Sequence, residues 1–151
     1  MALTDDIRLL SKVPLFQDLG DDQLRLIAFG AERRHVPGGQ ILFREKSPAE
    51  CAFVVVGGSF ELSILGRNGK PKVEATATPG TMLSELALVT LVERKFTAVA
   101  QSDSDVIRIT RSLFHRLLEE YPDVAAIVEG RIRDNISGMA KAAAAMQYRF
   151  N

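Results

Sequence analysis

Residues 79–100 read PGTMLSELALVTLVERKFTAVA and combine a turn, a short helix and an arginine. Pro79 and Gly80 are expected to end one strand and turn the chain, because proline fixes φ and glycine accepts positive φ. Residues 85–89 are expected to form one short helical turn, whose first N–H groups lack partners within the helix. Arg94 then stands at the start of the next strand. The segment thus places unpaired N–H groups and a permanent positive charge close together.

This combination fits the chemistry of a bound nucleotide. A helix N-terminus attracts anions through its N–H groups and its dipole, and an arginine offers a planar fork to phosphate oxygens. Glu85 cannot favour a phosphate, but its carboxylate is a strong acceptor for a sugar hydroxyl. A molecule that carries both groups is a nucleotide. On spacing alone, however, a simple ion pair between Glu85 and Arg94 near the surface is the stronger alternative.

Short strands with turns between them lie on both sides of this segment. Residues 66–69, of sequence GRNG, are typical of a hairpin turn. The periodicity predicts strands at residues 40–44, 51–56, 59–65, 72–77, 96–100 and 105–110. We therefore expect an α+β fold with a small antiparallel β-barrel, of the jelly-roll kind, over residues 32–110.

Helical patterns flank this barrel. Asp21 and Asp22 start one helix, where acidic side chains suit the positive end of the dipole. Thr110 is a suitable N-cap for the helix that follows the last strand, and Pro122 starts a longer helical pattern. We expect one domain over residues 1–151, with short helices at 1–31 and C-terminal helices, the last of them long, at 111–151.

The composition is that of an ordinary globular domain. The chain carries 19 basic and 19 acidic side chains, and its formal net charge of zero lowers the expectation of DNA binding. No apolar stretch is long enough to span a bilayer, and the N-terminus lacks the basic region of a signal peptide. We therefore expect a cytoplasmic protein without membrane contact. The single cysteine, Cys51, lies in an apolar run and is expected to be a buried hydrophobe.

Catalytic and metal-binding patterns are not evident. A metal site of the cupin type needs several convergent ligands, and the only histidines are His35 and His115, which are expected to be surface or packing residues. Neither Cys51 nor any serine stands in a nucleophile elbow. We therefore expect no enzyme, no catalytic residue, no metal and no cofactor.

Residues 79–100 resemble the phosphate-binding cassette of the cyclic nucleotide-binding domain family, which includes catabolite activator proteins, protein kinase A regulatory subunits and cyclic-nucleotide-gated channels. Residues 85–88, ELAL, match the family pattern Gly-Glu-Leu-Ala-Leu after its glycine, and Arg94 follows at the family's spacing. The resemblance covers nearly the whole chain and includes residues 13–16 in the helical entry, 36–42 and 54–62 in the first strands, and 107–114 at the exit into the next helix.

The resemblance implies a role for each residue of the cassette (residues 79–100). Glu85 would accept a hydrogen bond from the ribose 2′-hydroxyl, and Arg94 would pair with the cyclic phosphate. The backbone N–H groups of Leu86 and Ala87 would help to hold the phosphate oxygens. The neighbouring apolar residues expected to line the pocket are Leu83 and Val73.

Three residues depart from the family pattern. Ser84 stands at the usual glycine, where it restricts the backbone but offers a hydroxyl to the phosphate. Lys95 and Phe96 stand where small residues are usual, so Lys95 adds charge and Phe96 adds bulk. The resemblance implies a non-catalytic sensor of cyclic AMP, with cyclic GMP as the other candidate. The alternative is a domain that no longer binds ligand and serves only as a protein interaction module.

The C-terminal helix is the expected route to a partner. Its apolar residues follow a short heptad seam that could pair two copies of the chain, or could pack on the chain's own barrel. Family transcription factors carry a helix-turn-helix after this helix, and the chain ends too soon for one, so we expect no DNA contact. The output would pass through a homodimer or an effector protein of unknown identity. The seam residues are Ile132, Ile136, Met139, Ala143 and Met146.

Overall fold

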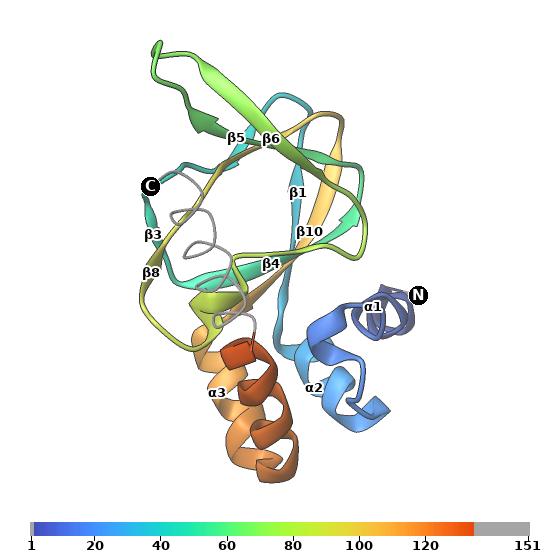
Figure 1. Ribbon diagram of the computed structural model, residues 1–151. Coiled ribbons are helices and arrows are strands. Elements are labelled where there is room, and N and C mark those ends of the chain that lie inside the picture. The colour runs from blue at the N-terminus through green and yellow to red at the C-terminus, as the bar shows by residue number, and fades with distance from the viewer. Residues whose placement is uncertain (1, 135–151) are drawn as a thin grey trace.

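The computed structural model describes residues 2–134, which form helices, then strands, then helices (Figure 1). The first helices and the 3-10 helices are α1 (Ala2–Leu10), η1 (Pro14–Phe16), α2 (Asp21–Gly30) and η2 (Glu85–Leu88), and the barrel is followed by α3 (Arg111–Glu120). The strands are β1 (Glu32–Val36), β2 (Ile41–Phe43), β3 (Pro48–Ala49), β4 (Cys51–Gly57), β5 (Phe60–Leu65), β6 (Pro71–Ala77), β7 (Met82–Leu83), β8 (Val92–Glu93), β9 (Thr97–Ala100) and β10 (Ser104–Thr110). Residues 122–134 are also helical.

The strands form three antiparallel sheets, ordered β1-β10-β4-β7, β2-β9-β5-β6 and β3-β8. The barrel is therefore built from separate sheets rather than from one continuous sheet. A cluster of buried side chains, which includes Phe53 and Val106 from the first sheet and Phe60 and Ala98 from the second, joins the two larger sheets. This arrangement confirms the α+β jelly roll expected from the sequence.

Strand β4 is buried along both of its faces. Cys51, Phe53 and Val55 belong to the cluster between the sheets, whereas Ala52 and Val54 belong to a second cluster under the helices. Successive side chains of a strand point to opposite faces, so a strand with apolar neighbours on both sides needs an unbroken apolar run. The sequence CAFVVV meets that need.

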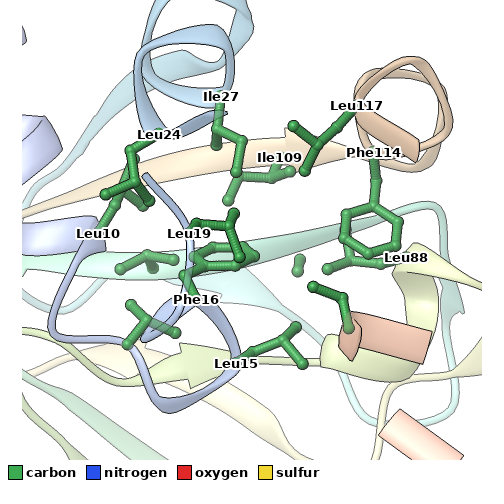
Figure 2. Close-up of a cluster of buried hydrophobic side chains, with 14 of the residues drawn as sticks. Leu10, Leu15, Phe16, Leu19, Leu24, Ile27, Leu88, Ile109, Phe114 and Leu117 are labelled. Atoms are coloured by element: carbon green, nitrogen blue, oxygen red, sulfur yellow. The ribbon is translucent and has the colours of Figure 1, made fainter. Parts of the chain in front are cut away.

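The second cluster joins the sheet to the helices. Figure 2 shows side chains from η1, α2 and α3, among them Phe16, Ile27 and Phe114, gathered around a common centre, with Leu88 of the cassette among them. Helix α3 begins as expected, because the N–H of Leu113 donates to Oγ1 of Thr110 at 3.1 Å. The helices are thus held on the sheet by one shared apolar core.

Residues 122–134 pack against the same core. Val128 and Ile132 are buried in it, and Ile132 is only 2% exposed, so this member of the expected seam faces the domain's own interior. Nη1 of Arg131 donates to the Leu15 carbonyl at 3.2 Å, and Nη2 pairs with the Asp18 carboxylate. The other seam residues lie outside the described residues: Ile136, Met139, Ala143 and Met146.

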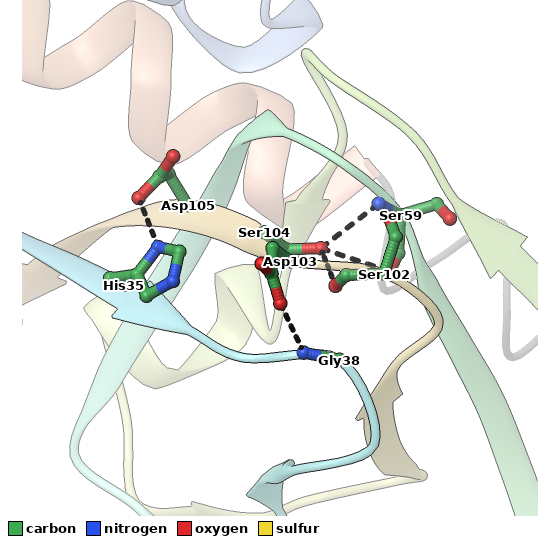
Figure 3. A network of polar contacts seen from close by, with 7 residues as sticks. All are labelled: His35, Gly38, Ser59, Ser102, Asp103, Ser104 and Asp105. Carbon is green, nitrogen blue, oxygen red and sulfur yellow. Dashed lines mark hydrogen bonds and ion pairs between the residues drawn. The ribbon is translucent and has the colours of Figure 1, made fainter.

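At the far end of the barrel, polar contacts hold three turns together (Figure 3). Oδ1 of Asp103 accepts a hydrogen bond from the Gly38 N–H at 2.9 Å, and Oγ of Ser104 accepts one from the Ser59 N–H at 3.2 Å. Gly58 lies beside this network with φ of +76°. The fully buried hydroxyl of Ser104 thus occupies the space that a side chain at Gly58 would need.

The backbone of the cassette is fastened to β4. The N–H of Gly80 donates to the Val55 carbonyl at 2.8 Å, and the N–H of Val55 donates to the Thr81 carbonyl at 3.0 Å. Strand β7 then pairs with β4, and Ser84 follows with φ 64° and ψ 45°, in the left-handed region. The short helix η2 therefore begins directly after a strained residue where the family pattern has glycine.

We expect Gly58→Ala to destabilise the domain by at least about 2 kcal/mol, because it adds backbone strain to a steric clash. The new Cβ would lie 2.1 Å from Oγ of Ser104 and 2.8 Å from the Asp103 carbonyl oxygen. Urea unfolding measures the change. The matched control is Gly57→Ala, where no heavy atom lies within 4 Å of the new Cβ, and equal effects of the two substitutions would contradict the packing described here.

We expect Ser84→Gly to raise the free energy of unfolding by about 0.5–1 kcal/mol. The left-handed backbone costs a non-glycine residue roughly 1–2 kcal/mol, and the greater flexibility of glycine in the unfolded chain offsets about half of the gain. Ser84→Ala keeps the strained backbone and is the control, with no gain expected. A gain of the same size in the alanine variant would show that relief of backbone strain is not the cause.

Candidate functional site

A cavity of about 550 Å³ lies beside the cassette, within the size range of small-molecule sites. Its wall is mostly apolar, with a few polar and charged groups. It is lined by Phe43, Leu62, Thr81, Met82, Leu83, Ser84, Glu85, Leu86, Val92, Glu93, Lys95 and Phe96. An adjoining cavity of about 610 Å³, between η1 and residues 122–134, shares Thr81, Met82 and Glu85 with it.

The structure brings five of the residues implied by the family pattern to this cavity. They are Leu83, Ser84, Glu85, Leu86 and Lys95. Glu85 is half-buried at the first position of η2, where the backbone N–H groups point away from the helix. Lys95 is exposed, and its Nζ lies 5.5 Å from the ring centroid of Phe96, which lines the cavity as its bulk led us to expect.

Two other residues of the expected site lie elsewhere. Ala87 is fully buried within η2, and its N–H donates to the Ser84 carbonyl at 3.0 Å, so this group is already engaged. Val73 lies on β6 opposite Ser63, is 52% exposed and does not line the cavity. Its role as a lining residue stays a prediction.

Arg94 lies in the wall behind the cavity and is only 6% exposed. Its Nη1 donates to the Cys51 carbonyl at 2.8 Å, and its Nη2 lies 3.4 Å from the Cys51 sulfur. The guanidinium carbon lies 4.6 Å from the ring centroid of Phe43 and 5.2 Å from that of Phe53, and the two rings are stacked. Arg94 is not itself a lining residue, but its guanidinium packs on the ring of Phe43, which does line the cavity.

Arg94 is a buried cation without a paired carboxylate among the described residues. None of the ion pairs among residues 2–134 includes it, although at 6% exposed it is the most buried charged residue in that part of the chain, ahead of Asp6 at 8%. A buried cation is costly unless an opposite charge or strong hydrogen bonds compensate it. One carbonyl and two ring faces compensate in part. An anion in the cavity would complete the compensation.

Several residues of the site carried no signal in the sequence. Phe43, Leu62 and Met82 line the cavity from three different strands, and Phe53 supports Arg94 from a fourth. Their only shared feature in the sequence is a place in an apolar strand pattern, which every core residue has. A strand register was needed to identify them.

The remaining candidates for chemistry do not form a second site. His35 lies on β1 with its Nδ1 3.1 Å from Oδ1 of Asp105 and is more than half exposed, and His115 is exposed on α3. Within residues 2–134, no group of three or more histidine, cysteine, aspartate or glutamate side chains is placed to hold a metal ion. Among the described helices, none has the length and apolar character needed to cross a membrane.

Comparison with known proteins finds relatives of this chain in one protein family. A family model described as a cyclic nucleotide-binding domain matches residues 33–121. The structure of a cyclic nucleotide-binding-like protein from Brucella abortus is 44% identical, with a TM-score of 0.70, over 76% of this chain and 98% of that chain. The regulatory domain of Toxoplasma gondii PKA, solved with cAMP, is 25% identical, with a TM-score of 0.71, over 76% of this chain and 44% of that chain.

Relatives also occur within much longer proteins. An uncharacterized NTE family protein of Mycobacterium tuberculosis is 32% identical over 119 residues, or 79% of this chain. The chain spans only 20% of the length of that relative, so the match concerns one region of it. Family model, fold and sequence identity agree, and the chain belongs to the cyclic nucleotide-binding domain family.

Proposed function

We propose that this domain binds cyclic AMP without catalysis, in the cavity beside the cassette, and acts as a regulatory module. The observation that carries the proposal is Arg94, a buried cation that packs on Phe43, a lining residue of the cavity of about 550 Å³, and that forms no ion pair with any of the described residues. Such a position favours an anionic ligand, because the ligand supplies the missing negative charge.

The phosphate end of the ligand would lie between Arg94 and η2. A guanidinium has five N–H donors, and the contacts of Arg94 with Cys51 use two of its nitrogens. The remaining donors would bind phosphate oxygens in the paired geometry that arginine provides. The N–H groups at the start of η2, where Leu86 lies, would approach the same oxygens.

The sugar and the base would occupy the rest of the cavity. The Glu85 carboxylate lines it next to η2 and would accept the ribose 2′-hydroxyl, while the apolar wall would contact the base. Phe96 offers a ring face for this purpose, and Lys95 above that ring adds positive charge near the ligand. Cyclic AMP is the ligand solved with the Toxoplasma gondii PKA regulatory domain, which supports it as the first choice over cyclic GMP.

The structure of the domain also offers a route for regulation. Leu88 of η2 packs in the same apolar core as Phe114 of α3 and Ile132 of the helix at 122–134. A nucleotide that orders η2 would therefore change the packing beneath these helices, by an amount set by its different affinities for the two arrangements. In a longer protein, or in a pair of chains, these helices would carry that change to an effector.

We expect Arg94→Met to weaken the binding of cyclic AMP by about 2–5 kcal/mol, since it removes one member of a buried charge pair. Methionine keeps an apolar stem against Phe43 and Phe53. Calorimetric titration with cyclic AMP, cyclic GMP and 5′-AMP measures affinity and preference together. Arg67→Met, on the exposed hairpin turn, is the matched control. Unchanged affinity in Arg94→Met would refute the site, and no binding by the wild type would favour the interaction module.

A second test concerns Glu85 and the sugar. We expect 2′-deoxy cyclic AMP to bind the wild type more weakly than cyclic AMP by about 1.5–3 kcal/mol, the range for a hydrogen bond to a charged group. In Glu85→Gln the gap between the two ligands should narrow, because the charged acceptor is gone. The same gap in both proteins would show that Glu85 does not bind the 2′-hydroxyl.

A further inference from the structure

Arg111 occupies a junction between the barrel, the cassette and the C-terminal helices. It is the first residue of α3, directly after the N-cap Thr110. Its backbone N–H donates to the Glu50 carbonyl at 3.2 Å, which joins the start of α3 to the segment before β4. Its side chain is half-buried and does not line the cavity. Any effect of Arg111 on a ligand therefore has to pass through the groups it holds.

The guanidinium of Arg111 holds three backbone carbonyls. Nε donates to Ala87 at 2.8 Å, and Nη2 donates to Thr90 at 2.9 Å and to Ala49 at 3.1 Å. Ala87 and Thr90 lie at the C-terminal end of η2, where carbonyls lack partners within the helix and attract a cation. Ala49 belongs to β3, on the opposite side of the junction. One side chain thus connects η2 to β3.

The segment that Arg111 holds also holds Arg94. Arg111 contacts the carbonyls of Ala49 and Glu50, and Nη1 of Arg94 donates to the carbonyl of Cys51, the next residue, at 2.8 Å. The two arginines therefore hydrogen-bond to the carbonyls of three consecutive residues, 49–51. Arg111 joins the segment that contacts Arg94 to the end of η2, in addition to the pairing of β3 with β8.

We propose that Arg111 is a positioning residue for the ligand site: it sets the distance between η2 and the Arg94 support, and it connects both to the start of α3. This role rests on the proposed nucleotide binding, which it extends to a residue outside the cavity. Lysine cannot replace it, because a single ammonium on a flexible stem lacks the planar fork that reaches carbonyls on two sides.

The test compares Arg111→Met and Arg111→Lys with Arg116→Met. Arg116 lies on the same helix, is exposed, and its one ion pair among the described residues is to Glu120, so it is a matched control. Amide hydrogen exchange of the ligand-free chain is measured first. We expect exchange to rise at least about tenfold at Ala87, Val89 and Thr90, whose N–H groups bond within the cassette, in both Arg111 variants.

The same variants are then titrated with cyclic AMP. We expect the Kd for cyclic AMP to rise about tenfold in both Arg111 variants and to change by no more than about twofold in Arg116→Met. Exchange at β4 and β10 should stay unchanged, because these strands pair with each other independently of Arg111. Arg111→Lys keeps the positive charge and serves alone if the methionine variant does not fold.

Three results would overturn the proposal. They are unchanged cassette exchange, a uniform rise across the sheets and the cassette, and an affinity loss that Arg111→Lys restores in full. If the wild type binds no cyclic nucleotide, the proposed function fails, but the exchange measurement still decides whether Arg111 positions η2. The two failures are therefore distinguishable.

Discussion

Strand β4 is buried on both faces, and the neighbouring parts of the domain take their positions from it. One face contributes Phe53 and Val55 to the core between the sheets, and the other contributes Val54 to the core under the helices. Its edges pair with β10 and β7, and its backbone binds both ends of the Gly80–Thr81 turn. Because a strand with two apolar faces is stable only when both are covered, β4 needs both the second sheet and the helices as neighbours.

The cassette, which lines the cavity, is anchored at two points, one on β4 and one in the helical core. Its first half hydrogen-bonds to β4, and its short helix is anchored by Leu88, which is fully buried in the helical core. Between these anchors stands Ser84, in a backbone conformation that disfavours any side chain. Backbone strain of this kind is often concentrated at ligand sites, where surrounding contacts hold it in place.

The charged groups around the cavity differ in burial and in how firmly they are held. Arg94 is desolvated and held by a carbonyl and two ring faces, so its orientation is fixed before any ligand arrives. Lys95 is exposed and keeps its charge in water, where it contributes less to affinity. A fixed buried arginine and a half-buried glutamate would be organised in advance of the proposed ligand, and such preorganisation lowers the entropic cost of binding.

Much of this molecule could be predicted from local sequence patterns. Six of the strands, the hairpin turn at residues 66–69, the capping by Thr110 and the short helix at Glu85 depend on neighbouring residues, because turns, caps and periodicity are local properties. The sequence patterns did not predict β1, β3, β7 and β8. The family pattern around residues 85–94 likewise identified the family, and the family model confirms it.

The contacts that make the site depended on the tertiary structure. Phe43 and Phe53 meet around Arg94 only through strand pairing, and Arg111 reaches Ala49 and Ala87 only after the barrel closes. Likewise Ile132, one residue of the expected seam, packs in the helical core of its own domain. The sequence pattern around an apolar or charged residue does not indicate which distant residue it will contact. That contact is determined by long-range packing.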